Sequence, residues 1–537
     1  MARWLRYTRT ALACCAALTF AACGGGGGGS AATSGGGGGP PPDPTWTAGV
    51  YAAPASLAAY CAAPRSGTDL ATGKPYPDKL GSAVWENHFL RAWTHAYYLW
   101  YSEVADLNPA PYTTKSYFDL LKTTAVTASS NPKDKFHFTH PTSAWEQLSR
   151  TGVQAGYGVT WVLLSPPKTL PRKLVAAYTE PGTPAIAAGL ARGAEVVTVD
   201  GADLVNINTQ AGVDVLNAGL FPAAGGESHT FGVVDTPGAA ARSVTLISAA
   251  IASTPVQNVH TLPGATGLVG YFQFNDHIAT AESVLIAAFT QLQQAHVAEL
   301  VIDIRYNGGG YLAIASEVAF MVAGPGRTAG KTFEQQSFND QYPSTNPITG
   351  AALAPEPFLD VALGLDPSAA GTPPGTPLPH LDLARVFVLT GPGTCSASEA
   401  IMNGLNGVGV QVVEIGSTTC GKPYGFYPQD NCGTTYFSIE FKGINALGFG
   451  DYTDGFSPAN AVTRIASPLP GCSVVDDFTK QLGDPAEARL AAALGYLATQ
   501  TCPLATGLEP PASPLHADGV MAKSEWLMNR IMRNAAQ

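Results

Sequence analysis

Residues 384–405 read ARVFVLTGPGTCSASEAIMNGL, and this stretch decides the fold class that the sequence predicts. The apolar, β-branched run 384–390 is typical of a strand that is buried on both faces. Gly and Pro interrupt it, and residues 396–405 then have the composition of a helix, with Ser396 or Ser398 near its N-cap and Glu399 in its first turn. A buried strand that leads directly into a helix is the repeating unit of a parallel α/β sheet.

The same alternation continues on both sides of this stretch. We therefore predict an α/β core, a largely parallel sheet flanked by helices, over residues 256–505. The further predicted strands are 268–274, 299–304 and 410–415, and the further predicted helices are 279–295 and 312–323.

Three loops with chemically useful residues directly follow predicted strands: RYNGGG (305–310), GPGTCSAS (391–398) and GSTTCGKPYG (416–425). The carboxyl ends of parallel strands meet at one edge of a sheet, where ligands bind. We therefore expect the Gly-rich loop, Ser396 and Lys422 to lie together in space.

This set suits acyl transfer. A serine hydroxyl is a weak nucleophile until a base accepts its proton, and a neutral lysine can be that base. Lowering a lysine pKa from about 10.4 to about 7 costs roughly 4–5 kcal/mol, which burial among uncharged neighbours such as those of Lys422 supplies. Backbone N–H groups near Gly308 to Gly310 and at Ala397 could hold the oxyanion.

Three motifs resemble those of the C-terminal-processing (tail-specific) serine peptidases: Ser-Ala-Ser-Glu at 396–399, Gly421-Lys422, and DIRYNGGG at 303–310. The resemblance implies that Ser396 is the nucleophile and Lys422 the general base of a Ser/Lys dyad, with Ser398 structural. It also implies that the oxyanion donors are Ala397 N–H and one of the loop glycines, Gly308 or Gly309.

Two positions depart from this family. Phe426 stands where many relatives carry the Gln that orients the lysine amine, and Gly407 where some carry Asp. The residue that positions Lys422 is therefore open, with Gln429, Asp430 and Tyr424 as candidates. The tricorn-type branch uses a His, and the sequence assigns that role to neither His277 nor His260.

Residues 182–204, GTPAIAAGLARGAEVVTVDGADL, resemble the signature of a PDZ domain. The resemblance implies a β-rich PDZ-like domain over 151–255, to which a peptide C-terminus adds as a strand while a glycine-containing loop holds its carboxylate. That loop would be Gly156, Tyr157, Gly158 and Val159. The alternative is a β-rich spacer without a ligand.

The N-terminus has the features of an export signal. Three arginines precede a short apolar run, residues 10–22, which predicts a signal peptide over 1–22. The run ends in Phe-Ala-Ala-Cys, which resembles a bacterial lipobox and implies acylation of Cys23; the alternative is an ordinary signal followed by a free Cys. Residues 23–45 are a Gly/Pro-rich tether. We therefore expect an exported, lipid-anchored protein of the bacterial cell envelope, facing the periplasm or the cell surface.

Two segments remain. Aromatic and apolar residues at helical spacing within 80–125 predict a small N-terminal helical domain over 46–150. Residues 506–537 are predicted to be a C-terminal tail.

Composition narrows the partners. The chain has 537 residues and a net charge of −11 without a basic patch, so we predict no nucleic-acid binding. Six cysteines remain after the signal and Cys23, and in an exported chain they predict disulfides, with Cys420–Cys432 and Cys472–Cys502 as the local choices among 15 connectivities. They lack the usual spacing of metal ligands, and we predict neither a metal nor a cofactor.

The resulting prediction is a serine endopeptidase that cleaves exported proteins or peptides, recognised by their C-termini through the PDZ-like domain. The alternative is an inactive, tethered peptide-binding lipoprotein on a peptidase-like fold. Two S-x-x-K sequences, at 130–133 and 165–168, contain Pro and are predicted to be loops. The sequence leaves the oligomeric state open.

Overall fold

The structure is a computed structural model that describes residues 39–69, 72–165, 169–461, 466–503 and 518–522. The chain divides into two units, Met1–Pro40 and Pro41–Gln537, and all described helices and strands belong to the second. The predicted signal peptide, Cys23, most of the tether and most of the C-terminal tail lie outside the described residues. The predicted domain boundaries within the second unit stay predictions.

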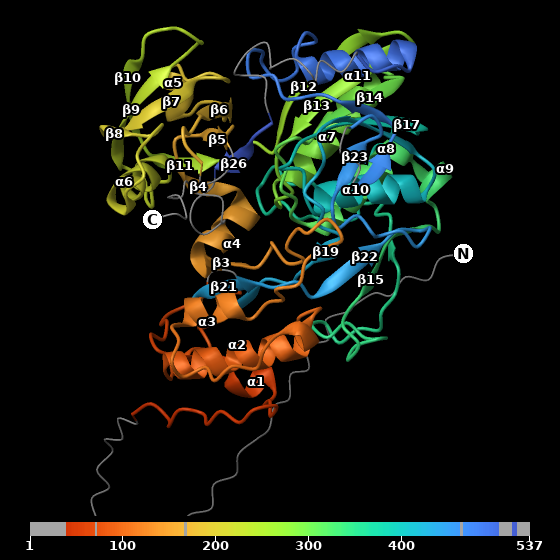
Figure 1. The fold of residues 1–537 in the computed structure, drawn as a ribbon. Coiled ribbons are helices and arrows are strands. Elements are labelled where there is room, and N and C mark those ends of the chain that lie inside the picture. The colour runs from red at the N-terminus through yellow and green to blue at the C-terminus, as the bar shows by residue number, and fades with distance from the viewer. Residues whose placement is uncertain (1–38, 70–71, 166–168, 462–465, 504–517, 523–537) are drawn as a thin grey trace, which may run out of the picture. The chain divides into compact units, whose positions relative to one another are not determined.

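A six-stranded sheet forms the centre of the α/β core (Figure 1). Its strand order is β12-β13-β14-β17-β18-β25, and the four pairings from β13 to β25 are parallel. The edge strand β12 runs antiparallel to β13, so the sheet is mixed and the predicted parallel pattern fails at this edge. The strands are β12 (Val256–Gly264), β13 (Gly267–Phe274), β14 (Glu299–Asp303), β17 (Arg385–Thr390), β18 (Gln411–Gly416) and β25 (Gly471–Ser473).

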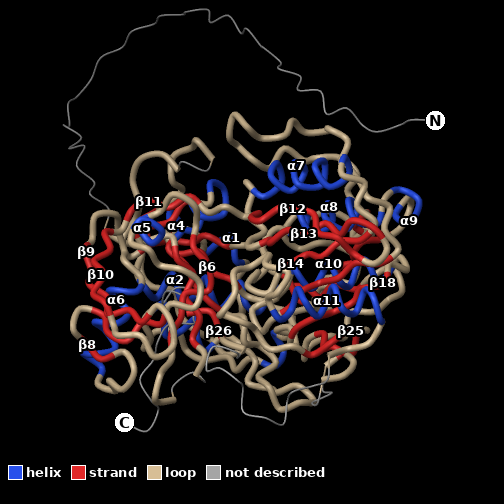
Figure 2. Tube along the Cα trace, turned by 90° about the horizontal axis from the view of Figure 1, so that it is seen from above, coloured by secondary structure: helices blue, strands red, loops and turns tan. Residues whose placement is uncertain are grey.

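Helices cover both faces of this sheet because successive strand residues point to opposite sides. Ile302 and Val388 pack with α7, α8 and α10, whereas Val301 and Phe387 pack with α11. Figure 2 shows α7 and α11 on opposite sides of β13 and β14. Every core helix and strand predicted from the sequence is present within two residues of its expected bounds. The helices are α7 (Ala281–Gln294), α8 (Leu312–Ala323), α10 (Ala397–Gly407) and α11 (Ala488–Thr499).

A second sheet, antiparallel throughout, has the order β10-β9-β7-β6-β5-β26, with β8 paired to β7. Helix α6 packs Leu216 and Leu220 into the same apolar cluster as Trp161 and Phe231. Strand β26 comes from the far C-terminal part of the chain, and the sequence did not predict it. The elements are β5 (Val159–Leu163), β6 (Leu174–Thr179), α5 (Pro184–Ala187), β7 (Glu195–Val199), β8 (Ala202–Asp203), α6 (Gln210–Leu220), β9 (Ser228–Val234), β10 (Arg242–Ile247) and β26 (Val520–Ala522).

The N-terminal helices share a core with residues that come much later in the chain. Trp93 and Phe118 pack against Tyr436 of β21, and β21 also pairs with β3. A disulfide joins Cys61 to Cys432 in the same region. The elements here are α1 (Pro54–Leu57), β1 (Tyr60–Cys61), β2 (Lys79–Leu80), α2 (Ala83–Tyr97), the 3₁₀ helix η1 (Tyr101–Glu103), α3 (Thr114–Leu120), β3 (Phe138–Pro141), β20 (Gln429–Asn431) and β21 (Thr434–Phe437).

Short elements complete the fold. Strand β4 pairs with β11, a four-stranded sheet has the order β16-β15-β22-β19, and β23 pairs with β24. They are α4 (Thr142–Thr151), β4 (Val153–Gly156), β11 (Ala249–Ala252), α9 (Pro325–Thr328), β15 (Thr332–Ser337), β16 (Glu356–Pro357), β19 (Tyr424–Gly425), β22 (Phe441–Ile444), β23 (Phe456–Pro458) and β24 (Ser467–Leu469).

All six cysteines after Cys23 form disulfides: Cys61–Cys432, Cys395–Cys420 and Cys472–Cys502. The predicted Cys472–Cys502 bond is confirmed, and the predicted Cys420–Cys432 bond is wrong. Cys420 instead meets Cys395 because β17 and β18 are adjacent parallel strands whose carboxyl ends lead into these two residues.

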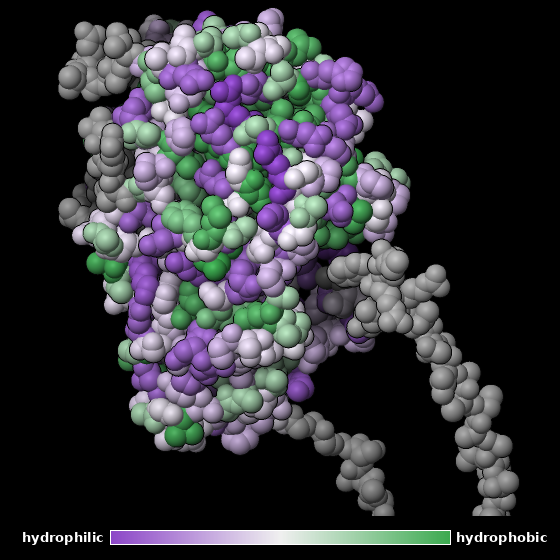
Figure 3. Space-filling model, turned by 90° about the vertical axis from the view of Figure 1, so that its right-hand side faces the viewer, coloured by the Kyte–Doolittle hydropathy of each residue, from purple (hydrophilic) through white to green (hydrophobic). Residues whose placement is uncertain are grey.

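Within the described residues, no helix is both long and apolar enough to span a lipid bilayer. On the face in Figure 3, hydrophilic and hydrophobic side chains are interspersed. This mixture fits a chain in which only 13% of the residues are charged.

Candidate active site

The loops after β17 and β18 meet at the carboxyl edge of the core sheet, as the strand pattern predicts. The Cys420 N–H donates to the Thr394 carbonyl at 3.0 Å, and the Cys395–Cys420 disulfide joins the two loops directly. The hydroxyl of Thr394 donates to the carbonyl of Ile304, directly after β14. The three loops that follow β14, β17 and β18 are therefore in contact.

Ser396 precedes the first residue of α10 in an unusual backbone conformation. Its φ is +58° and its ψ is −117°, which a residue with a side chain rarely adopts. Such strain persists only where the surroundings enforce it, and it concentrates at functional sites. The residue is half-buried and lines a large cleft, so the strand–turn–helix segment presents a serine to that cleft.

Glu399 binds the backbone of both loops. Its Oε2 accepts hydrogen bonds from the N–H groups of Ser396 at 3.0 Å and of Lys422 at 2.8 Å. Its Oε1 accepts from the Gly421 N–H at 2.8 Å and from the Thr419 hydroxyl at 2.5 Å. Burial raises the pKa of Glu399, and these hydrogen bonds lower it in part. One buried carboxylate thus fixes the relative position of Ser396 and Lys422.

Lys422 is almost fully buried and also lines the cleft. Its ammonium nitrogen lies 3.8 Å from the centre of the Phe426 ring and 5.2 Å from that of Phe136, distances typical of cation–π contact. Two aromatic rings therefore contact this nitrogen, and the N-terminal region contributes one of them, Phe136.

Two of the three candidates for positioning Lys422 are engaged elsewhere. Asp430 accepts hydrogen bonds from Thr142 and Arg65, and Gln429 donates to the Asp430 carbonyl. Tyr424 lies in the cleft beside Trp100.

The Gly-rich loop packs directly against the serine turn. Gly309 has a φ of +90°, and a Cβ at this position would lie 2.8 Å from Ser396 Cβ and 2.7 Å from the Cys395 carbonyl oxygen, so only glycine fits. Its N–H donates to Asn307 Oδ1 at 2.9 Å. Gly308 is exposed in the cleft, and Ala397 is the first residue of α10, where an N–H has no partner within the helix.

Two buried residues, Asn307 and His277, hold this loop through hydrogen bonds. Asn307 is fully buried; its carbonyl accepts from Cys395 N–H and from the Ser398 hydroxyl. His277 Nδ1 lies 2.9 Å from Asn307 Oδ1, which already accepts from Gly309, so the imidazole donates. Burial lowers the pKa of His277 to about 3, so this histidine is a neutral support of the loop.

The loop that the PDZ resemblance selects, Gly156 to Val159, lines the same cleft of about 1960 Å³. Tyr157 donates its hydroxyl to the Gly219 carbonyl, and Gly158 has a φ of +77°. Strand β26 pairs antiparallel with β5, with Val520 opposite Leu163 and Ala522 opposite Trp161. The edge to which a peptide would add is therefore occupied by the chain's own residues.

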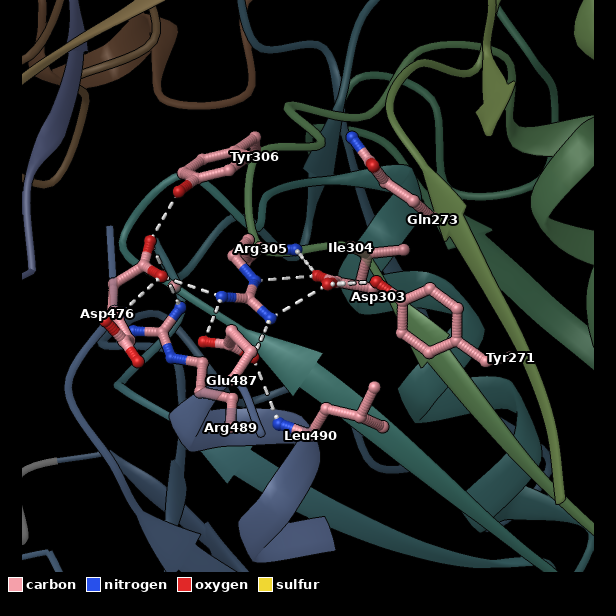
Figure 4. A network of polar contacts seen from close by, with 12 residues as sticks. Tyr271, Gln273, Asp303, Ile304, Arg305, Tyr306, Asp476, Glu487, Arg489 and Leu490 are labelled. Atoms are coloured by element: carbon pink, nitrogen blue, oxygen red, sulfur yellow. Dashed lines mark hydrogen bonds and ion pairs between the residues drawn. The ribbon is translucent and has the colours of Figure 1, made fainter. Parts of the chain in front are cut away.

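A buried ionic network lies under the Gly-rich loop (Figure 4). Arg305 donates to both oxygens of Asp303, to both oxygens of Glu487 and to Asp476, at 2.7–2.9 Å. Tyr271 adds a hydrogen bond to Asp303. The Asp and Arg of the DIRYNGGG motif, Asp303 and Arg305, therefore have a structural role: they hold the start of the Gly-rich loop in place.

The same network reaches other parts of the fold through Asp476. Arg192, next to β7 of the second sheet, donates to Asp476 at 2.6 Å and to the Tyr306 hydroxyl at 2.7 Å. Arg489 pairs with Asp476 and with Asp518, just before β26. Burial alone would raise the pKa of Asp476, but the three arginines hold it far below its usual value.

A buried acid that binds the backbone of Tyr427, a cleft residue, should make stability pH-dependent. Glu440 accepts the Tyr427 N–H, and burial raises its pKa from 4.5 to about 8. The folded state then keeps a proton that the unfolded state releases, so stability falls as pH rises through this window. Between pH 6 and 8 the free energy of unfolding should fall by about 2 kcal/mol for this reason. Denaturant titrations should show a smaller decline for Glu440→Gln, and parallel curves for the two proteins would contradict the prediction.

Sequence reasoning missed the roles of Glu399, Asn307, His277 and Phe136. A Ser followed three residues later by Glu is a helix N-terminus signature and could have identified Glu399. Phe136 lies 286 residues before Lys422, and no local pattern links the two.

Fold and site together define an α/β protein that presents a strained serine and a buried lysine at one sheet edge. Residues 266–425 match the model of Peptidase family S41. Over 175 residues the chain is 29% identical to a Carboxyl-terminal-processing protease of Picosynechococcus sp., a match that covers 32% of this chain and 40% of that protein. The matched family model and this relative both agree with the class predicted from the sequence, a serine-type peptidase.

A solved structure from Bacteroides fragilis, described as an S41 protease, shares the fold. The TM-score is 0.56 at 21% identity, and the match covers 79% of this chain and 98% of the other. The similarity thus extends beyond the segment that the family model matches.

Proposed function

We propose that the chain is a serine endopeptidase in which Ser396 is the nucleophile and Lys422 the general base. The observation that carries the proposal is the shared Glu399 oxygen, which binds the backbone N–H of both residues. The strained serine turn and the closely packed Gly-rich loop support it.

The reaction follows from this arrangement. The neutral Lys422 amine takes the Ser396 proton while Oγ bonds to the substrate carbonyl carbon. The N–H groups of Ala397 and Gly308 hold the resulting oxyanion; the Gly309 N–H already donates to Asn307, so Gly308 replaces it as the loop donor. Lys422 then returns the proton to the leaving amine. Water, activated in the same way, hydrolyses the acyl-enzyme and releases Ser396.

The test is cleavage of a reduced, alkylated model protein, with new peptide termini identified by mass spectrometry. The intact chain should generate them and Ser396→Ala should not. If both proteins bind peptides and neither cleaves them, the result supports the alternative, an inactive, tethered peptide-binding lipoprotein. The replacement of the usual Gln by Phe426 would then explain why activity is lost.

The recognition of substrate C-termini by a PDZ-like domain belongs to the same proposal. The Gly156–Val159 loop opens onto the cleft that holds Ser396, and β5 follows that loop directly. A peptide that added to β5 would therefore border the cleft that holds Ser396.

Strand β26 gives this recognition a direct test. It covers the β5 edge, and Met521 packs beside Val162 and Tyr306. Deleting residues 518–537 should therefore lower the Kd of peptides with free apolar C-termini by roughly tenfold, because the tethered strand no longer competes. Fluorescence titration measures this. Deleting only 523–537 keeps β26 and should leave the Kd unchanged.

Two outcomes would reject this model. Equal affinity after both deletions would mean that β26 is a fixed part of the sheet. Equal affinity for free and amidated C-termini would reject capture of the carboxylate.

The proposal also includes the location of the protein. We infer that it is exported and held in the cell envelope by a lipid on Cys23. Palmitate labelling in a bacterial host should disappear in Cys23→Ala. Export of unlabelled, soluble native protein would contradict the anchor.

A further inference from the structure

Glu334 of β15 is an acidic residue in the wall of the cleft that holds Ser396. Only 6% of it is exposed, yet it lines the cleft together with Gln336, which lies two residues further along the same face of the strand. Burial and the negative charge of Glu356 raise the pKa of Glu334 to about 8. A strongly shifted pKa in a cleft is typical of a functional site.

Within the described part of the chain, the Glu334 carboxyl lacks a partner. None of these residues donates a hydrogen bond to it, and no cationic side chain among them pairs with it. The charged group that acts on it is Glu356, on the paired strand β16, and this group has the same sign. A buried acid without a counter-ion costs stability, so the matching cation is expected to come from a ligand in the cleft.

The backbone of β22 leaves room for this carboxyl. A Cβ at Gly443 would lie 2.2 Å from the carboxyl carbon of Glu334 and 2.3 and 2.6 Å from its two oxygens. Glycine at this position therefore lets the carboxyl pack directly against the strand. The Gly443 N–H donates to the carbonyl of Pro423, the residue after Lys422. The seat of the carboxyl is thus bonded to the lysine loop.

Tyr452 connects Glu334 to the serine turn. It lines the cleft, and its pKa is raised by burial and by the negative charges of Glu334 and Glu399. Its hydroxyl is therefore close to both carboxyls, and Glu399 accepts the N–H of Ser396. Ala400, one helical turn after Ser396, also lines the cleft. A substrate bound at Ser396 would extend along this wall to Glu334.

We propose that Glu334 is a specificity-determining residue that pairs with a basic side chain, Lys or Arg, of the substrate near the scissile bond. The inference rests on the proposed peptidase function. An ammonium or guanidinium group would supply the hydrogen bonds that the carboxyl lacks and would favour its ionised form. The net charge of −11 also attracts cationic substrates to the protein.

The experiment begins with cleavage-site mapping in a peptide library in which Lys, Arg and apolar residues occur at every position. Native protein should cleave peptides with Lys or Arg enriched at one position near the cut bond. A peptide with this site is then compared with its analogue that carries Met at the same position. The ratio of the two kcat/KM values should be roughly tenfold for native protein and close to one for Glu334→Gln, which keeps the size of the side chain and removes its charge.

Glu356→Gln is the matched control. Glu356 lies opposite Glu334, but it is exposed and lies outside the cleft lining. Its substitution removes the same charge from the protein, so the variant should retain at least the native ratio. A native protein without a preference for a basic residue, or the same ratio in native protein and Glu334→Gln, overturns the inference.

A binding measurement separates this inference from the proposed function. A native protein that cleaves nothing would reject the peptidase, and the inference is then decided in Ser396→Ala. The probe is the reduced, alkylated model protein with its lysines either free or acetylated, because acetylation removes their charge. Acetylation should weaken binding to Ser396→Ala roughly tenfold and binding to Ser396→Ala/Glu334→Gln much less. An equal loss in the two proteins overturns the inference.

Discussion

Lys422→Met should lower kcat/KM roughly 10⁴-fold or more, with most of the loss in kcat. Methionine keeps the length and apolar stem of lysine, so the contacts with Phe426 and Phe136 and the cleft wall are retained. It offers no amine to take the Ser396 proton, and a serine hydroxyl without a base is a weak nucleophile. Initial rates on the model substrate measure the effect.

Lys442→Met is the matched control. Lys442 lies on β22, partly exposed, with its ammonium 3.9 Å from Asp451. Its replacement should leave kcat/KM within about twofold, since it contacts no reacting group. Retention of more than a tenth of native activity by Lys422→Met would exclude this lysine as the general base.

Arg305→Ala should lower the free energy of unfolding by about 3–5 kcal/mol. The substitution removes a fully buried cation and leaves Asp303 and Glu487 without their main partner, whereas Asp476 keeps Arg192 and Arg489. Buried carboxylates that lose their counter-ion must be protonated or hydrated, and both cost free energy. Urea titration measures the loss, and activity should fall with it because the network supports the Gly-rich loop.

Arg242→Ala provides the comparison for this network. Arg242 pairs with Asp235 at the surface, with both side chains more than a third exposed. Such pairs contribute about 0–1 kcal/mol, so this variant should unfold close to the native midpoint. Similar losses for the two variants would show that the Arg305 network is not a stabilising centre.

The sequence predicted the arrangement of the site where local pattern and sheet geometry suffice. Buried strands followed by Gly-rich loops placed Ser396, Lys422 and Gly308–Gly310 at one edge, and the structure brings these loops into contact. The alternation of strand and helix is a short-range signal, and the shared edge follows from parallel pairing.

Features that depend on long-range pairing were not predictable in this way. Strand β26 joins β5 across more than 350 residues, and Cys61 reaches Cys432 across 371. Cys420 and Cys432 are close in sequence, which predicted the wrong bond between them. The better guide is the sheet edge, where the loops after two adjacent predicted strands bring Cys395 beside Cys420.

Covalent labelling with a fluorophosphonate probe, followed by peptide mass spectrometry, tests the Ser396–Lys422 pair itself. The expected result is one adduct on the peptide that contains Ser396, absent in Ser396→Ala and formed far more slowly in Lys422→Met. An unlabelled native protein, or labelling of Ser396 at the same rate with and without Lys422, would contradict a Ser/Lys peptidase.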